Sequence, residues 1–190
     1  MAPQPGRALA APFLLGLLLG SLGCASGATP TGMMLGPLPA PAPVSAGPAS
    51  EVPTLTIAVS GGRATNPVGT SKISNRAFAE ALAIEIARTG WFRPVFDHVA
   101  DYHLDVAIVS FEQPFWGWLD MEVALVADWT LVRLESDERR WARRVSSRFT
   151  ATEQDSQWGI RRLRLANEGA ARANIAEGVA RLVDLALLDL

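Results

Sequence analysis

The sequence contains few cysteines and histidines and has little net charge. Its 190 residues include one cysteine and two histidines, and the formal net charge is -2. A single thiol excludes an internal disulfide, and a near-neutral balance argues against binding nucleic acid through a strongly basic face. The serines have no supported histidine partner for a nucleophilic triad. We therefore expect no nucleic-acid partner, no cofactor and no enzyme activity.

The first fifty residues contain almost no charge, and their apolar run is too short to span a bilayer. Arg7 is the only charged residue before Glu51, and the apolar segment from Ala8 to Leu22 has about fifteen residues, against the roughly twenty that a spanning helix needs. A basic start, a short apolar core and small residues are typical of a secretory signal peptide, which is removed from the mature chain. We assign residues 1–23 to this signal.

Two cleavage sites compete in this region. Cleavage after Ala28 would leave a soluble periplasmic or secreted chain, whereas cleavage before Cys24 would leave that thiol at the new N-terminus. Residues 21–24, SLGC, resemble the lipobox of bacterial lipoproteins, although the serine and leucine stand in the reverse of the usual order. The resemblance implies that Cys24 is acylated, for example with palmitate, and Ala25 in place of an aspartate is compatible with the outer membrane. A lone exported thiol has no disulfide partner, which favours the lipoprotein.

Residues 24–50 are rich in proline, alanine and glycine, and prolines recur at every second position from 37 to 43. Such a segment has no periodic apolar face from which to form a core. We expect a disordered tether that reaches up to about 80 Å at roughly 3 Å per residue; the alternative is a disordered leader without an anchor. Residues 51–190 then form a single domain with its own core.

The domain has the residue pattern of an α+β fold. We expect an antiparallel sheet of about four to five strands with a mixed edge and two helices on one face. The expected strands cover residues 54–60, 91–96, 102–109, 119–131 and a run that includes Trp141, Val145 and Phe149. The expected helices cover residues 75–89, between a Ser74 N-cap and Gly90, and about 158–187, with a possible break near Asn167.

The last two strands carry a register prediction. Apolar residues match across the hairpin if Trp129 lies opposite Val145, and this requires a turn with an odd number of residues or a bulge. The same register places Asp128 close to Arg144 on the outer face of the sheet.

Three phrases carry a family resemblance: ADYHLDV at 100–106, WTLVRLESDERRWARRV at 129–145 and RLRLANEGAARANIAEGV at 162–179. Together with the layout of residues 54–187, they resemble small proteobacterial outer-membrane lipoproteins of unassigned function. The layout is also similar to the domain shared by the LPS-assembly lipoprotein and the N-terminal part of the Tol-system periplasmic protein. The resemblance implies no functional residue beyond the acylated Cys24.

The segment QPFWGWL at 113–119 is the most informative local feature of the domain. Phe115, Trp116 and Trp118 surround Gly117 at an expected connection between strands, where exposed residues are normally small or polar. These aromatic residues form either a contact with a partner or a bilayer interface, or a lid that closes the end of the core. We therefore take Phe115, Trp116 and Trp118 as the candidate surface for contact with a partner or a membrane.

Two charged sets are weaker candidates. Arg140, Arg144 and Arg148 form a row that could meet lipopolysaccharide phosphates, although a solvated strand face explains it as well. Asp101, His103 and Asp105 leave one face of a strand and have the chemistry of metal ligands, with His98 just before them. Neighbours on one strand face lie nearly 7 Å apart, so we expect a solvated face and no metal.

The sequence thus predicts a lipid-anchored periplasmic interaction module of a cell-envelope assembly, without catalysis. Its anchor would bind the outer membrane, and its partner would be an envelope protein complex or lipopolysaccharide. The alternative is a carrier or assembly chaperone for lipid or lipopolysaccharide, which needs an apolar cleft or the aromatic segment. A metal-dependent hydrolase on the Asp101 face is the third hypothesis.

Overall fold

A computed structural model describes residues 25–36, 52–66, 69–96, 99–114 and 120–189. Five strands form one open sheet in the order β2-β1-β3-β4-β5. Strand β1 pairs in parallel with both β2 and β3, and β3, β4 and β5 form an antiparallel meander. The expected α+β fold with a mixed edge is therefore confirmed.

The first half of the domain follows its sequence signals closely. Strand β1 covers Thr54–Ser60, and helix α2 covers Asn75–Thr89. The Ser74 hydroxyl caps α2 by accepting a hydrogen bond from Ala77 N, and Gly90 ends the helix at a φ of 74°, a left-handed conformation that favours glycine. Strand β2, Arg93–Pro94, is short and lies at the sheet edge, where proline does not interrupt a central ladder.

The meander contains β3 (Tyr102–Glu112), β4 (Met121–Arg133) and β5 (Glu138–Ala151). The predicted bulge is present, between Leu131 and Val132 of β4. The specific pair of Trp129 with Val145 is wrong, because Val145 lies opposite Ala127 instead. Relative to the predicted register, the turn between Arg133 and Glu138 and the bulge together shift the pairing by two residues. Because side chains alternate between the two faces of a sheet, a shift by two leaves the apolar side chains on the expected face.

Helix α3, Gly159–Asp189, is continuous, so the break considered near Asn167 is wrong. Asn167 is buried and donates to Ser71 O at 3.0 Å, which satisfies its amide inside the helix. About two turns later, Asn174 accepts a hydrogen bond from Trp129 Nε1 at 3.2 Å and donates to Val145 O at 2.9 Å. Asn174 therefore joins α3 to the sheet, and Asn167 joins it to the loop before α2.

Two glycines let α3 approach the sheet closely. A Cβ atom at Gly178 would overlap the indole of Trp129, and one at Gly169 would overlap the ring of Phe149. Trp129 is the largest fully buried side chain in the described core. The two glycines are thus the positions where aromatic rings of β4 and β5 pack against the helix.

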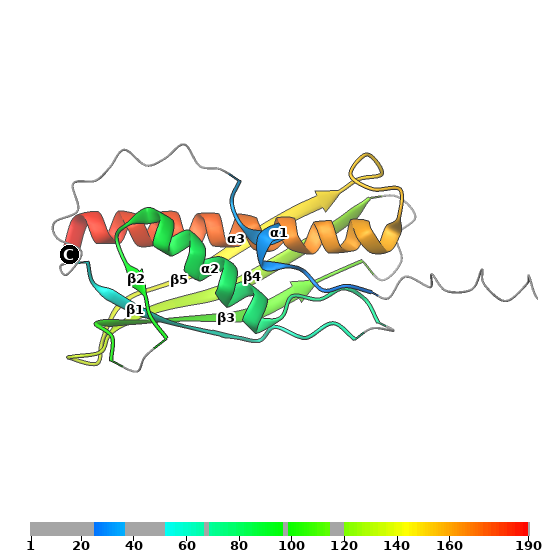
Figure 1. Cartoon of the computed structure of the whole chain (residues 1–190). Coiled ribbons are helices and arrows are strands. Elements are labelled where there is room, and N and C mark those ends of the chain that lie inside the picture. Colours follow the sequence, from blue (N-terminus) through cyan, green and yellow to red (C-terminus); the bar gives the residue numbers. More distant parts are fainter. Residues whose placement is uncertain (1–24, 37–51, 67–68, 97–98, 115–119, 190) are drawn as a thin grey trace, which may run out of the picture.

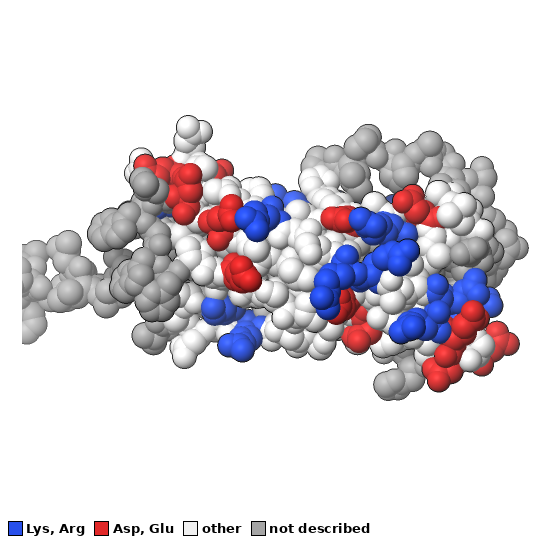
Figure 2. All heavy atoms as spheres, turned by 180° about the vertical axis from the view of Figure 1, so that it is seen from behind, with Lys and Arg blue, Asp and Glu red and all other residues white. Residues whose placement is uncertain are grey.

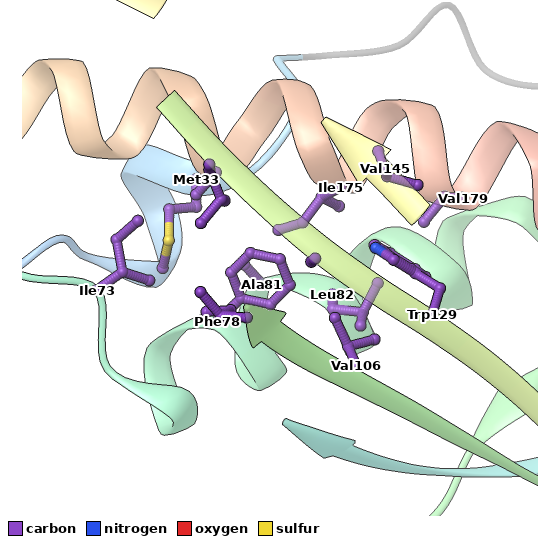
Figure 3. Close-up of a cluster of buried hydrophobic side chains, with 14 of the residues drawn as sticks. Met33, Ile73, Phe78, Ala81, Leu82, Val106, Trp129, Val145, Ile175 and Val179 are labelled. Atoms are coloured by element: carbon purple, nitrogen blue, oxygen red, sulfur yellow. The ribbon is translucent and has the colours of Figure 1, made fainter. Parts of the chain in front are cut away.

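Residues 25–36 belong to the folded domain, so the prediction of a disordered tether over 24–50 is wrong for this part; residues 37–50 include none that the structure describes. The short helix α1, Pro30–Met33, lies across α2 and α3 on the helical face of the sheet (Figure 1). Met33 is fully buried beside Ile73 and Phe78 (Figure 3). The segment therefore adds a third helix to the domain and the Met33 side chain to its core.

None of the helices in the described residues has the length and apolar character of a membrane span.

The close approach of α3 predicts an unusual response to a Gly-to-Ala change. In an exposed helix this change stabilises by up to about 1 kcal/mol, but Gly178→Ala would force Trp129 to move and should lower the free energy of unfolding by about 1–3 kcal/mol. Gly169→Ala should cost less, because Phe149 is 36% exposed and can shift. Urea unfolding measures both, and a Gly178→Ala protein as stable as wild type would contradict the packing.

Candidate functional site

The candidate site is the N-terminal strap, residues 25–36, and the end of the molecule from which it starts. Glu168 of α3 is buried, and its carboxylate accepts hydrogen bonds from Thr29 N at 3.0 Å and from Thr29 Oγ1 at 2.9 Å. The Thr29 hydroxyl in turn caps α1 by accepting a hydrogen bond from Gly32 N. Gly32 packs directly on the Glu168 carboxylate, where a Cβ atom would not fit. One buried acid thus orders the first half of the strap.

A second buried acid holds the other half. The Glu85 carboxylate of α2 accepts a hydrogen bond from Leu35 N at 2.9 Å and pairs with Arg88 at 3.0 Å. Arg88 also donates to Leu35 O, and Arg172 of α3 donates to Gly32 O at 3.1 Å. Most of these contacts use backbone atoms of the strap, so its position depends on the acids and arginines of α2 and α3.

The strap begins at the end of the molecule where α3 begins (Figure 1). Ser26 Oγ accepts a hydrogen bond from Arg164 at 2.9 Å, and Ala28 N donates to Lys72 O at 3.0 Å. Ala28 is buried in the core. Ser26 and Ala28 are two and four residues after Cys24, which itself lies outside the described residues.

The start of α3 carries exposed apolar and basic side chains at this end. Trp158 is 77% exposed and Ile160 is 58% exposed, and Arg161 is also exposed. Arg162 is buried and donates to Ser156 O at 2.8 Å. The first turn of α3 contains no acidic residue, although the helix dipole favours acids there and disfavours arginines.

The predicted aromatic contact of Phe115, Trp116 and Trp118 lies outside the described residues. Gln113, the first residue of the segment QPFWGWL, is held at the same end of the molecule. Its amide donates to Asn167 Oδ1 at 2.7 Å and to Ser71 O at 2.8 Å, and its carbonyl accepts from Lys72 Nζ.

The predicted anion row has a carboxylate beside each arginine. Arg144 makes two hydrogen bonds of 2.7 Å to Asp128, as its predicted proximity requires. Arg148 pairs with Glu122 at 2.9 Å, and Arg140 pairs with Glu138 at 3.3 Å. Basic and acidic side chains stand next to one another on the rear surface (Figure 2). These three arginines therefore bring little net positive charge, and binding of lipopolysaccharide phosphates stays a prediction.

The contact between Asp128 and Arg144 also changes the pKa values of both side chains. The hydrogen bonds from Arg144 lower the pKa of the Asp128 carboxyl, and the same pair raises the pKa of Arg144. Both side chains are largely exposed, so the pair contributes little to stability.

The residues considered for a metal join β1 to β3. Asp101 accepts hydrogen bonds from Thr54 N and Thr54 Oγ1, both at 2.7 Å, which lower the pKa of its carboxyl. His103 Nδ1 lies 2.9 Å from Thr56 Oγ1. Among the described residues no group of histidine, cysteine and acidic side chains has the arrangement of a metal site, and His98 is not among them. The structure gives Asp101 and His103 local roles between strands.

An apolar groove of about 710 Å³ lies between α2 and the edge of the sheet formed by β1 and β2. Ile57, Ala83, Ile84 and Val95 contribute to its lining, together with Phe96, whose side chain is fully exposed. The ion-paired side chains of Arg76 and Glu80 also line it. A volume of this size is typical of a small-molecule pocket.

A smaller hollow of about 220 Å³ borders the glycine-rich loop after β1, at Gly61, Gly62, Arg63 and Lys72. Gly61 has a φ of 80° and packs on Ile108 O, so its conformation serves the close approach of two backbones. The sequence lacks the residue order of a phosphate-binding loop, and Lys72 is engaged with Gln113 and lies over the Phe111 ring.

Glu85 and Glu168 were not predicted as site residues from the sequence. A signal for Glu85 was present, because it falls between Leu82 and Ile86 on the apolar face of α2, where an acid is rarely buried without a partner. The partners could not be read from the sequence, since Thr29 and Glu168 are 139 positions apart.

No family model and no curated protein sequence matches the chain. Solved structures with a similar fold include protein XCC0632 from Xanthomonas campestris, of family DUF330, with a TM-score of 0.55 and 12% identity over 72% of this chain and 86% of that one. The hypothetical protein CT253 from Chlamydia trachomatis has a TM-score of 0.50 and 8% identity, over 70% and 97% of the two chains.

A protein from Caulobacter crescentus CB15 that is provisionally classed as a lipoprotein has a TM-score of 0.46 and 16% identity, over 70% and 88% of the chains. At these identities the likeness concerns the fold alone. The expected similarity to the LPS-assembly lipoprotein and the Tol-system protein stays a prediction.

The hydrogen bonds between the strap and Glu168 predict that Glu168 contributes strongly to stability. Glu168→Ala removes the acceptor of both Thr29 hydrogen bonds, and because bonds to a charged group are worth about 1.5–3 kcal/mol each, we expect a loss of about 3 kcal/mol or more in the free energy of unfolding. The matched control is Glu177→Ala on the same helix, which breaks an exposed ion pair with Arg181 and should cost at most about 0.5 kcal/mol. Equal costs in urea unfolding would contradict the role of Glu168.

Proposed function

We propose that the protein is a lipid-anchored interaction module of the bacterial cell envelope, acylated at Cys24 and without catalysis. It works on the periplasmic face of the outer membrane and serves an envelope protein assembly. The single observation that supports a lipid anchor at Cys24 is the position of the strap. Cleavage after Ala28 would remove a buried residue together with the contacts Ala28–Lys72 and Ser26–Arg164.

Cleavage before Cys24 leaves these contacts intact. The mature chain then starts with the residue that carries the lipid, and the fold begins with the next one. This geometry supports the lipoprotein reading of the SLGC motif independently of its reversed serine and leucine, because it depends on contacts downstream of the motif.

The mass of the mature N-terminus tests this proposal. We expect a chain that starts at Cys24 and carries the mass of acyl chains, and Cys24→Ser should abolish the acyl mass and release the protein from the membrane fraction. A matched control is Ala28→Leu, which obstructs cleavage after Ala28 but leaves the Cys24 site unchanged, so acylation should persist. A wild-type chain that starts at Thr29 would overturn the proposal.

A second candidate function rests on the apolar groove beside α2. A lipid carrier requires an apolar cleft, and the groove lined by Ile57, Ala83, Ile84 and Val95 provides one of suitable volume. Its lining is mainly aliphatic, and the Arg76–Glu80 ion pair lies on its rim as a polar contact for a headgroup. This supports a carrier of a single lipid chain as the alternative to the interaction module.

A fluorescent fatty acid distinguishes the two functions. If the groove holds lipid, cis-parinaric acid should bind the purified protein and gain fluorescence, and Ala83→Trp should abolish the gain by filling the groove. The control Ala180→Trp, at an exposed position of α3, should bind as wild type does. Absence of binding by wild type, or equal binding by Ala83→Trp, would contradict the carrier.

A further inference from the structure

We infer that the end of the domain formed by Trp158, Ile160 and Arg161 lies against the phospholipid bilayer. This inference rests on the proposed acylation of Cys24 and adds an orientation to it: the strap positions the domain directly on the membrane surface, in place of a long tether.

The strap leaves little slack between anchor and domain. Ala28 is buried and bonded to Lys72, and Ser26 is bonded to Arg164. Ala28 is four positions after Cys24, and an extended chain spans at most about 3.6 Å per residue. An acylated Cys24 therefore lies within about 14 Å of the buried Ala28, which is less than the thickness of one bilayer leaflet and its headgroups.

The surface nearest to the start of the strap has the composition of a membrane interface. Ile160 and Arg164 are four residues apart on α3, so they are neighbours on one face of the helix, and Arg164 contacts Ser26. Trp158 directly precedes the helix, and its carbonyl accepts a hydrogen bond from Arg162 N at 2.9 Å, so it lies at the start of the first turn, which contains Arg161. Tryptophan is favoured at the headgroup level, an exposed isoleucine gains by entering the acyl region, and arginine pairs with lipid phosphates.

The charges at the start of α3 fit this role better than a role in helix stability. Arg161 stands exposed in the first turn of a helix that has no acid there, a position that the helix dipole disfavours. Arg162 and Arg164 are engaged with the Ser156 carbonyl and with Ser26. The preceding loop carries the exposed acids Glu153 and Asp155, so the contact depends chiefly on Trp158 and Ile160, with Arg161 as its basic partner.

The opposite end of α3 supplies a matched comparison. Leu187 is 61% exposed, close to the 58% of Ile160, and lies about 40 Å away along a straight helix. If apolar exposure alone determined membrane contact, both positions would enter the bilayer. If the strap determines it, Ile160 enters and Leu187 does not.

The test uses the acylated full-length mature protein in vesicles of phosphatidylethanolamine and phosphatidylglycerol. A cysteine is placed by Ile160→Cys or by Leu187→Cys and labelled with the fluorophore NBD, since the acylated Cys24 sulfur does not react. We expect nitroxide-labelled lipids to quench most of the NBD fluorescence at position 160 and little at position 187. Melting temperatures equal to wild type verify that both variants fold.

Equal quenching at the two positions, or stronger quenching at position 187, would overturn the orientation while leaving the acyl anchor in place. The mass of each protein is measured first. A chain without acyl mass at Cys24 would overturn both the proposed anchor and the orientation, so the two failures are distinguishable.

Discussion

The buried carboxylate of Glu168 is the contact on which the rest of this structure depends. An ionised acid in a protein interior is costly unless its oxygens are hydrogen-bonded, and here the bonds come from Thr29 on a segment 139 positions away. The strap therefore satisfies the acid, and the acid orders the strap. Glu85 repeats the arrangement with Leu35, so two buried acids connect residues 25–36 to both long helices and determine where the chain enters the domain.

The sheet in turn holds these helices in place. Glycines at the positions that face Trp129 and Phe149 let α3 lie close to β4 and β5, and Asn174 joins the Trp129 indole to the Val145 carbonyl. One face of the sheet is thus covered by helices, while the other carries the ion pairs around Arg144 and Arg148. The result is an asymmetric domain whose strap, α3 start and Gln113 meet at one end.

Much of the fold follows from local signals in the sequence. The bounds of β1 and α2 and the caps at Ser74 and Gly90 are set by short-range chemistry, and the Asp128–Arg144 contact follows from strand alternation. The strap does not follow from such signals. Its burial depends on two side chains, Ala28 and Met33, and on backbone hydrogen bonds to acids far along the chain, neither of which produces a periodic pattern. The continuity of α3 was similarly hidden, because Asn167 is unfavourable in an isolated helix and is satisfied only by tertiary contacts.

Hydrogen exchange of the strap amides tests the central claim most directly. In the mature protein the amides of Ala28, Thr29 and Leu35 donate to Lys72 O, Glu168 and Glu85. We predict that all three exchange much more slowly than in an unstructured peptide, because exchange requires local opening of the strap. Exchange at the rate of an unstructured peptide would show that residues 25–36 form a free tether, and it would contradict both the strap and the membrane orientation inferred from it.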